Sequence, residues 1–198
     1  NELNTEEGKR LIDDLAAFGS PVMLFSGGEP VLREDLPELI DYAVKKGMRA
    51  VISTNGTLIT EEKARIFAKF NLSYIGVSLD GIGGVNDAFR GVKGAFDKAM
   101  DGIRNAKKAG IKVGLRFTIN KRNYKEIPRI FDLIDMEGIE RACFYHLVYA
   151  GRGSELMNED LSHEETRKSV DYILDRTKSF FDKGKPIEVL TVDNHADG

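Results

Sequence analysis

The sequence has little cysteine, little net charge and no long apolar run. Its only cysteine among 198 residues is Cys143, which excludes an internal disulfide and cannot alone supply the several thiolates of an iron–sulfur cluster. The formal net charge is -3, with acidic and basic residues intermixed, so no nucleic-acid partner is expected. No apolar run approaches the roughly 20 residues of a membrane helix, and no charged-then-apolar leader opens the chain. The default expectation is a cytoplasmic protein that binds small molecules and has no membrane partner.

Apolar runs alternate with helical periodicity along the whole chain. The hydrophobic content of 41% is enough for one sizeable core. Helices between successive strands imply right-handed crossovers and a parallel sheet, so we expect the α/β class. The sheet could be either a barrel or an open sheet. The expected strands cover residues 21–25, 50–52, 74–79, 111–119, 141–148 and 187–192.

Capping residues mark where the helices should begin. The expected caps are Thr5, Asp35 with Glu38, Thr60, Asn123 with Glu126, and Ser162 with Glu165. The last of these helices should run to about Lys183 and bury Val170, Ile173, Leu174 and Phe181.

The most informative strand end is Ser26-Gly27-Gly28-Glu29-Pro30. Two successive glycines let a ligand approach the main chain closely, and Glu29 can accept charge-assisted hydrogen bonds from an ammonium group. Ligands of parallel sheets bind at the carboxyl ends of strands. A Gly-rich turn without function is the alternative for this segment taken alone.

Two further strand ends carry polar residues. Ser53-Thr54-Asn55-Gly56 follows the second expected strand, and Ser78-Leu79-Asp80-Gly81 follows the third. Alternation places Ser78 and Asp80 on one face, where they could bind ribose hydroxyls or the methionine part of a cofactor. The alternatives are an ordinary Asn-Gly turn and an exposed strand end.

These three segments, in this order, resemble the strand ends of radical SAM enzymes. Gly27-Gly28-Glu29-Pro30 is similar to the GGEP motif that grips the amino group of S-adenosyl-L-methionine. The resemblance implies a partial parallel (β/α)6 barrel of radical SAM type whose first strand is missing. It also implies an enzyme with two cofactors, S-adenosyl-L-methionine and a 4Fe-4S cluster, the cluster in the full-length protein only, and an electron donor for that cluster. The cofactor-binding residues that it implies so far are Gly27, Gly28, Glu29, Pro30, Ser53, Asn55, Ser78 and Asp80.

The fourth and fifth strands add four candidates for cofactor binding. Arg116 and Thr118 alternate onto one polar face with Asn120, and a buried guanidinium needs a partner. By resemblance, Arg116 and Thr118 lie near the carboxylate and ribose of S-adenosylmethionine; an internal pair of Arg116 with Asp80 or Glu29 is equally open. By resemblance too, main-chain groups around His146 and Leu147 hold the adenine. His146 also fits a core histidine or a substrate contact.

Residues 145–153 and 190–198 resemble the haem-biosynthesis branch of the radical SAM superfamily. The resemblance implies removal of carboxylate-bearing side chains from a sirohaem-derived tetrapyrrole, begun by a 5'-deoxyadenosyl radical. An anionic tetrapyrrole needs cations, for which Arg90, Arg116 and Arg152 are available. The further candidate substrate residues are Tyr149, Asp193, Asn194 and His195.

The chain departs from the family pattern in its cysteines. It has no Cys-x-x-x-Cys-x-x-Cys loop, so no metal site is expected within these residues. We therefore expect residues 1–198 to be a single-domain fragment of the core barrel, truncated at both ends and inactive by itself. Two other functions stay open. One is a radical SAM peptide maturase, and the other is a noncatalytic barrel that acts as a binding module.

Overall fold

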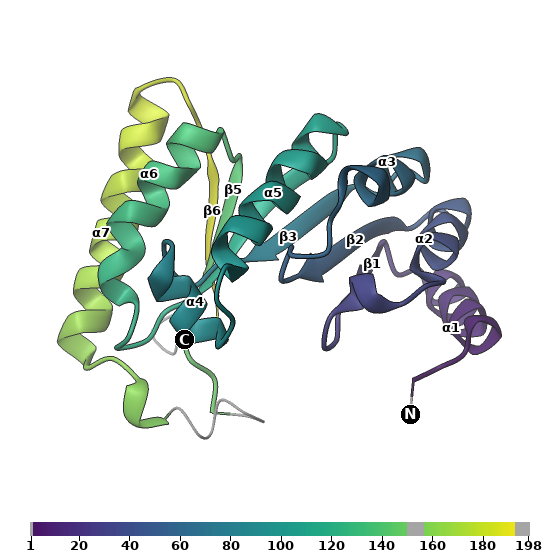
Figure 1. Ribbon diagram of the computed structural model, residues 1–198, viewed down its shortest axis with the longest axis horizontal. Helices are drawn as coiled ribbons and strands as arrows, with labels where there is room; N and C mark the ends of the chain where they lie inside the picture. Colours follow the sequence, from purple (N-terminus) through teal and green to yellow (C-terminus); the bar gives the residue numbers. More distant parts are fainter. Residues whose placement is uncertain (1, 150–156, 193–198) are drawn as a thin grey trace. The chain divides into compact units, whose positions relative to one another are not determined.

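The computed structural model describes residues 2–149 and 157–192 (Figure 1). The chain divides into two compact units. Unit 1 comprises Asn1–Ser78 and Lys98–Val113, and unit 2 comprises Leu79–Asp97 and Gly114–Gly198. The expectation of a single domain over residues 1–198 stays a prediction.

Unit 1 is a three-stranded parallel sheet with its connecting helices. Strands β1, β2 and β3 pair in chain order, with Leu24 opposite Val51 and Ile52 opposite Ile75. Ile12, Leu36, Ile40, Ile52 and Ile75 are almost fully buried, so the apolar stripes of the helices pack on the sheet. The elements are α1 (Thr5–Phe18), β1 (Val22–Phe25), η1 (Pro30–Leu32), α2 (Leu36–Lys45), β2 (Arg49–Thr54), α3 (Glu61–Lys69), β3 (Tyr74–Ser78) and most of α5 (Ala95–Lys108).

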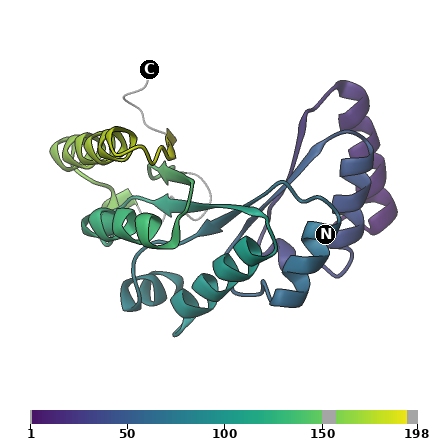
Figure 2. The same ribbon diagram turned by 90° about the horizontal axis from the view of Figure 1, so that it is seen from above.

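Unit 2 also has three parallel strands, β4, β5 and β6, again paired in chain order. Figures 1 and 2 show α6 and α7 side by side along β5 and β6. The ring of Phe144 on β5 stacks 5.4 Å from that of Phe131 on α6, which lies 6.2 Å from that of Phe180 on α7. The elements are α4 (Gly84–Arg90), β4 (Lys112–Thr118), η2 (Tyr124–Glu126), α6 (Ile127–Glu137), β5 (Arg141–Tyr145), α7 (His163–Asp182) and β6 (Glu188–Val192).

The α/β class is confirmed. The six strands follow the order β1-β2-β3-β4-β5-β6, and all the pairings within each unit are parallel. The sequence pattern missed α4, a helix of seven residues, because so short a segment shows little periodicity. Within residues 2–149 and 157–192, no helix is both long and apolar enough to cross a membrane.

Two predicted helix caps are confirmed. Thr60 accepts a hydrogen bond from the Lys63 N–H, and Ser162 with Glu165 forms a complete capping box at the start of α7. These polar residues satisfy backbone donors that a helix leaves unpaired at its start.

Three predicted caps are wrong. Asn4, one residue before Thr5, caps α1 through a capping box with Glu7. Asp35 makes no capping bond because its carboxylate accepts from the Thr5 hydroxyl and pairs with Arg33. Asn123 likewise makes no capping bond at η2, because tertiary partners described below occupy its side chain. In each case, a tertiary or neighbouring contact replaced the local one.

The buried face of α7 was predicted only in part. Ile173 and Phe180 are buried, whereas Leu174 is 59% and Phe181 72% exposed. Ile173 and Phe180 are seven residues apart, two helical turns, so they share a face. Phe180 therefore fills the core position that the pattern gave to Phe181.

Candidate functional site

In unit 1, an open turn follows β1. The backbone of Gly27 has a φ of 140°, which a residue with a side chain adopts only under strain. A Cβ added to Gly27 or Gly28 would meet nothing within 4 Å. These glycines therefore leave exposed main chain that a ligand can approach.

The Glu29 carboxylate is held by three donors. Its Oε1 accepts from the Thr54 hydroxyl at 2.6 Å and from the Val31 N–H at 3.1 Å, and its Oε2 accepts from the Asn55 N–H at 2.8 Å. An ionised carboxylate offers about four lone-pair sites, so Oε2 keeps room for another donor. The side chain is half-buried, and an ammonium group of a ligand can reach it from solvent.

Thr54 is the residue that the sequence analysis missed. Its side chain is 3% exposed, and its Oγ1 donates to Glu29 while accepting from the Gly56 N–H at 3.0 Å. Ser53 is half-buried. Alternation along β2 buries Ile52 and Thr54 but not Ser53, and this signal could have selected Thr54 in advance.

Asn55 contributes its main chain to Glu29 and its side chain to the turn. The side-chain Oδ1 accepts from the Thr57 N–H at 2.8 Å and the Thr57 hydroxyl at 2.7 Å. The predicted Asn-Gly turn is therefore present, and its geometry aims the Asn55 N–H at the carboxylate. The Asn-Gly turn is therefore also the structure that donates to Glu29.

Gly102 on α5 supports this turn from behind. A Cβ at Gly102 would lie 2.1 Å from the carbonyl oxygen of Gly56, so only glycine lets α5 approach so closely. The helix backbone thereby fixes the turn that carries Asn55.

A pocket of about 600 Å³ in unit 1 includes the turn after β1. The segment from Ser26 to Pro30 forms its polar side, and its apolar side includes Leu3, Leu11, Met23, Leu24 and Leu32. Its volume lies in the range of small-molecule sites.

In unit 2, Asp80 is committed to protein partners. Its side chain is 1% exposed; it forms an ion pair with Arg90, and Oδ1 accepts from the Thr118 N–H at 3.0 Å. Burial raises the pKa of Asp80, while Arg90 and the Thr118 N–H act in the opposite direction. Arg90, a candidate for pairing with a tetrapyrrole carboxylate, is thus engaged inside the protein.

Two asparagines complete the network around Asp80. Its N–H donates to Asn86 Oδ1 at 2.9 Å, and its carbonyl accepts from Asn123 Nδ2 at 3.1 Å. Asn123 also donates to the Thr118 carbonyl and accepts from the Asn120 N–H. The loop after β3 and the end of β4 are therefore tied together by side-chain amides.

Arg116 and Thr118 alternate with buried Leu115 and Phe117, as predicted. The Arg116 guanidinium lies 4.6 Å from the centre of the Tyr145 ring, a cation–π contact. In the described part of unit 2, the Asp80 carboxylate pairs with Arg90 and not with Arg116.

The remaining candidates fall in three places. Ser78 is half-buried at the end of β3, Leu147 is buried, and His146 is half-buried just after β5. The exposed Tyr149 donates to Asp160. Arg152, Asp193, Asn194 and His195 lie outside the described residues.

Comparison with protein families gives a match between residues 1–134 and the model described as "Radical SAM superfamily". The chain belongs to the radical SAM superfamily. This confirms the resemblance read from the three strand ends.

The curated relatives of this radical SAM chain include haem-pathway proteins. It is 68% identical to "Fe-coproporphyrin III synthase" of Methanosarcina barkeri, over 100% of this chain and 50% of that protein. It is 42% identical to "Pre-heme d1 synthase" of Dinoroseobacter shibae, over 99% of this chain and 49% of that protein. The resemblance to the haem-biosynthesis branch and the prediction of an enzyme family are thus confirmed. The chain spans about half the length of these relatives.

Solved structures show the same fold. The structure "Native anSMEcpe with bound AdoMet and Cp18Cys peptide" matches with a TM-score of 0.77 and 18% identity, over 96% of this chain and 56% of that one. This likeness confirms the partial parallel barrel of radical SAM type.

S-adenosylmethionine and a 4Fe-4S cluster are the cofactors of the radical SAM superfamily. The residues present fit the first: open glycine backbone and a carboxylate with acceptor capacity suit a ligand that carries an ammonium group. They do not fit the second, because the one cysteine, Cys143, is buried on β5. The cysteine ligands of the cluster are not among these 198 residues.

Proposed function

We propose that the chain is the S-adenosylmethionine-binding core of an enzyme that removes carboxylate-bearing side chains from a sirohaem-derived tetrapyrrole. The observation that carries the proposal is the Glu29 carboxylate, held by Thr54, Asn55 and Val31 beside open glycine backbone. In this proposal the free acceptor site on Oε2 receives the ammonium group of the cofactor.

The other cofactor contacts stand as part of the proposal. The main chain at Gly27 and Gly28, with Pro30 stiffening the exit, holds the methionine end, and Arg116 receives the carboxylate. Asp80 acts by positioning the Thr118 main chain, since its own oxygens are engaged. The remaining predicted cofactor residues stand as candidates in each unit by itself: Ser53, Asn55 and Ser78 in unit 1, and Thr118, His146 and Leu147 in unit 2.

When bound, S-adenosylmethionine and the cluster, with an electron donor, supply a 5'-deoxyadenosyl radical that abstracts hydrogen from the substrate. The residues described here bind and orient the cofactor for that step. The names of the two haem-pathway relatives support a tetrapyrrole as the substrate.

The test uses the full-length protein, reconstituted with iron and sulfide under a reductant. We expect cleavage of S-adenosylmethionine to 5'-deoxyadenosine and, with a didecarboxylated sirohaem as substrate, loss of acetate-type side chains measured by mass spectrometry. Absorbance first verifies that the cluster has formed. If S-adenosylmethionine is then not cleaved, the enzymatic proposal is refuted.

A peptide substrate is the second candidate. The solved structure that shares the fold contains a peptide with its cofactor. Tetrapyrroles and candidate peptides offered to the same reconstituted protein separate the two substrate classes. Turnover of a peptide with no change in any tetrapyrrole would favour the maturase.

A further inference from the structure

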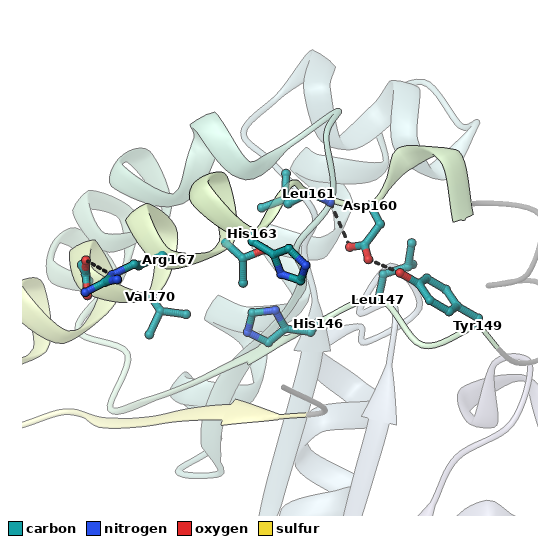
Figure 3. Close-up of a pocket in the computed structure, with 10 residues that line it drawn as sticks. His146, Leu147, Tyr149, Asp160, Leu161, His163, Arg167 and Val170 are labelled. Atoms are coloured by element: carbon teal, nitrogen blue, oxygen red, sulfur yellow. Dashed lines mark hydrogen bonds and ion pairs between the residues drawn. The ribbon is translucent and has the colours of Figure 1, made fainter. Parts of the chain in front are cut away.

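Unit 2 contains a pocket that shares only His146 and Leu147 with the cofactor proposal. Figure 3 shows it between the end of β5 and the start of α7, and its volume is about 520 Å³. We call it the β5–α7 pocket. It is lined by His146, Leu147, Tyr149, Asp160, Leu161, His163, Thr166, Arg167, Val170 and Asp171.

The α7 residues of this pocket share one face of the helix. Thr166, Arg167 and Val170 lie three, four and seven residues after His163, so the four form one stripe. The capping box of Ser162 with Glu165 fixes where the helix begins, and His163 is its first residue. In Figure 3 the imidazole of His163 points into the pocket toward that of His146.

His163 is available to a ligand. It is exposed, and no hydrogen bond or ion pair engages its side chain within residues 2–149 and 157–192. His146 differs, since it is half-buried and takes part in an interaction inside the protein. The free imidazole is therefore that of His163.

The donor set of the pocket does not suit a bare metal ion. In the described part of the chain, no three or more His, Cys, Asp or Glu side chains gather as metal ligands. Iron inside a tetrapyrrole is different, because the pyrrole nitrogens already hold it and a single axial ligand completes the attachment.

Among the side chains of this pocket, imidazole is the one suited to iron. The Tyr149 hydroxyl donates its proton in a hydrogen bond to Asp160, so it is already engaged by a protein partner. Asp160 is occupied by this bond and by the Leu161 N–H at 2.9 Å.

We propose that the β5–α7 pocket binds an iron tetrapyrrole, with the His163 imidazole as the axial iron ligand and Arg167 pairing with a carboxylate of the macrocycle. Leu147, Leu161 and Val170 supply apolar surface for the ring. This inference rests on the proposed function, because it gives a location to the substrate class named there.

Arg167 fits the carboxylate role. Its side chain is 85% exposed and lies 4.0 Å from Asp171, a long ion pair that contributes little and is easily exchanged. It stands one turn along α7 from His163, so a macrocycle ligated by His163 carries its side chains past this guanidinium.

The experiment titrates the full-length protein with ferric coproporphyrin III and, separately, with metal-free coproporphyrin III. With the iron form, we expect a saturable red shift of the Soret band and a ferric EPR signal that differs from that of the free porphyrin. His163→Ala should abolish both signals and weaken binding of the iron form roughly tenfold or more. Imidazole added to His163→Gly should restore them.

Further variants separate ligation from charge pairing. Arg167→Ala should weaken binding of both porphyrins roughly three- to tenfold without moving the Soret band. The matched control is Lys168→Ala, the next residue on α7 and paired with Glu164, which should change neither. His163→Met should keep a ligand but shift the spectrum, and circular dichroism of each variant checks its folding.

Several outcomes would overturn the inference. These are unchanged Soret and EPR signals in His163→Ala, loss of both signals in His146→Ala but not in His163→Ala, or equal binding of the two porphyrins by the wild type. Cofactor cleavage without any Soret shift would reject this pocket and leave the proposed function standing. A Soret shift that depends on His163, without cofactor cleavage, would do the opposite.

Discussion

Glu29 in unit 1 and Asp80 in unit 2 both carry a carboxylate just after a strand, yet their burial and their hydrogen-bond partners differ. Glu29 is half-buried and, within the described residues, accepts hydrogen bonds from neutral donors only. Asp80 is buried and pairs with the guanidinium of Arg90. Neutral donors orient a carboxylate and leave its charge for a ligand, whereas a cation neutralises it.

This difference shows that a carboxylate at a strand end is not a binding group by its position alone. What decides is whether the surrounding fold supplies a cation. For Glu29 the partners come from η1 and from the turn after β2; for Asp80 the cation comes from α4, a helix that the sequence pattern did not reveal.

The largest effect on stability is expected for Asp80→Asn. The amide keeps the bond from the Thr118 N–H but loses the ion pair with Arg90, which is itself one-third exposed. We expect the free energy of unfolding to fall by about 2 kcal/mol, measured by urea denaturation. Affinity for S-adenosylmethionine should change less than in Glu29→Gln, and the reverse order would break the comparison.

Glu29→Gln should weaken binding of S-adenosylmethionine more than it lowers the free energy of unfolding, the opposite of Asp80→Asn. The amide cannot offer charge to an ammonium group, so the Kd for S-adenosylmethionine should rise about ten- to a hundredfold. The measurement is calorimetric titration of the full-length protein, with urea denaturation alongside. An unchanged Kd would remove Glu29 from the cofactor site.

Thr54→Val should produce a weaker form of the same defect. The substitution removes the hydroxyl that donates to Glu29 and leaves the Gly56 N–H without its acceptor. We expect a roughly threefold to tenfold rise in the Kd for S-adenosylmethionine and a loss of about 1 kcal/mol in unfolding free energy. Ser53→Ala, one residue away, is the matched control for packing and should change the unfolding free energy less.

The smallest effect concerns Asp87, which contrasts with Asp80 inside unit 2. The N–H groups of Phe96 and Gly94 lower the pKa of Asp87, whereas burial raises that of Asp80. A lowered pKa gives stability that is present above the unfolded pKa of about 3.9 and lost as pH falls through the folded pKa.

We therefore expect wild type to be slightly more stable than Asp87→Asn at pH 7, and this advantage to shrink below about pH 4. Urea denaturation across this pH range measures it. A difference that grows with acidity would mean that the bonds from Phe96 and Gly94 do not stabilise the ionised form.

Local sequence signals predicted helix caps correctly where the capping residue bonds to a backbone N–H close to it in the sequence. Thr60 and the pair of Ser162 with Glu165 cap their helices because the partner N–H lies three residues ahead. Asp35 and Asn123 carry the same signal but bind Thr5, Arg33, Asp80 and Thr118 instead. Thr5 lies 30 residues from Asp35 and Asp80 lies 43 from Asn123, and contacts of this range leave no mark in a short window of sequence.

The sequence by itself determined the α/β class and the family, because periodicity and motif order are properties of the chain. It also placed Glu29 at the end of a strand. Only the tertiary structure decided that Thr54 donates to Glu29, that Gly102 must lack a side chain and that Asp80 forms an ion pair with Arg90. The physical reason is that hydrogen bonds and close approaches depend on distances in space, which join residues far apart along the chain.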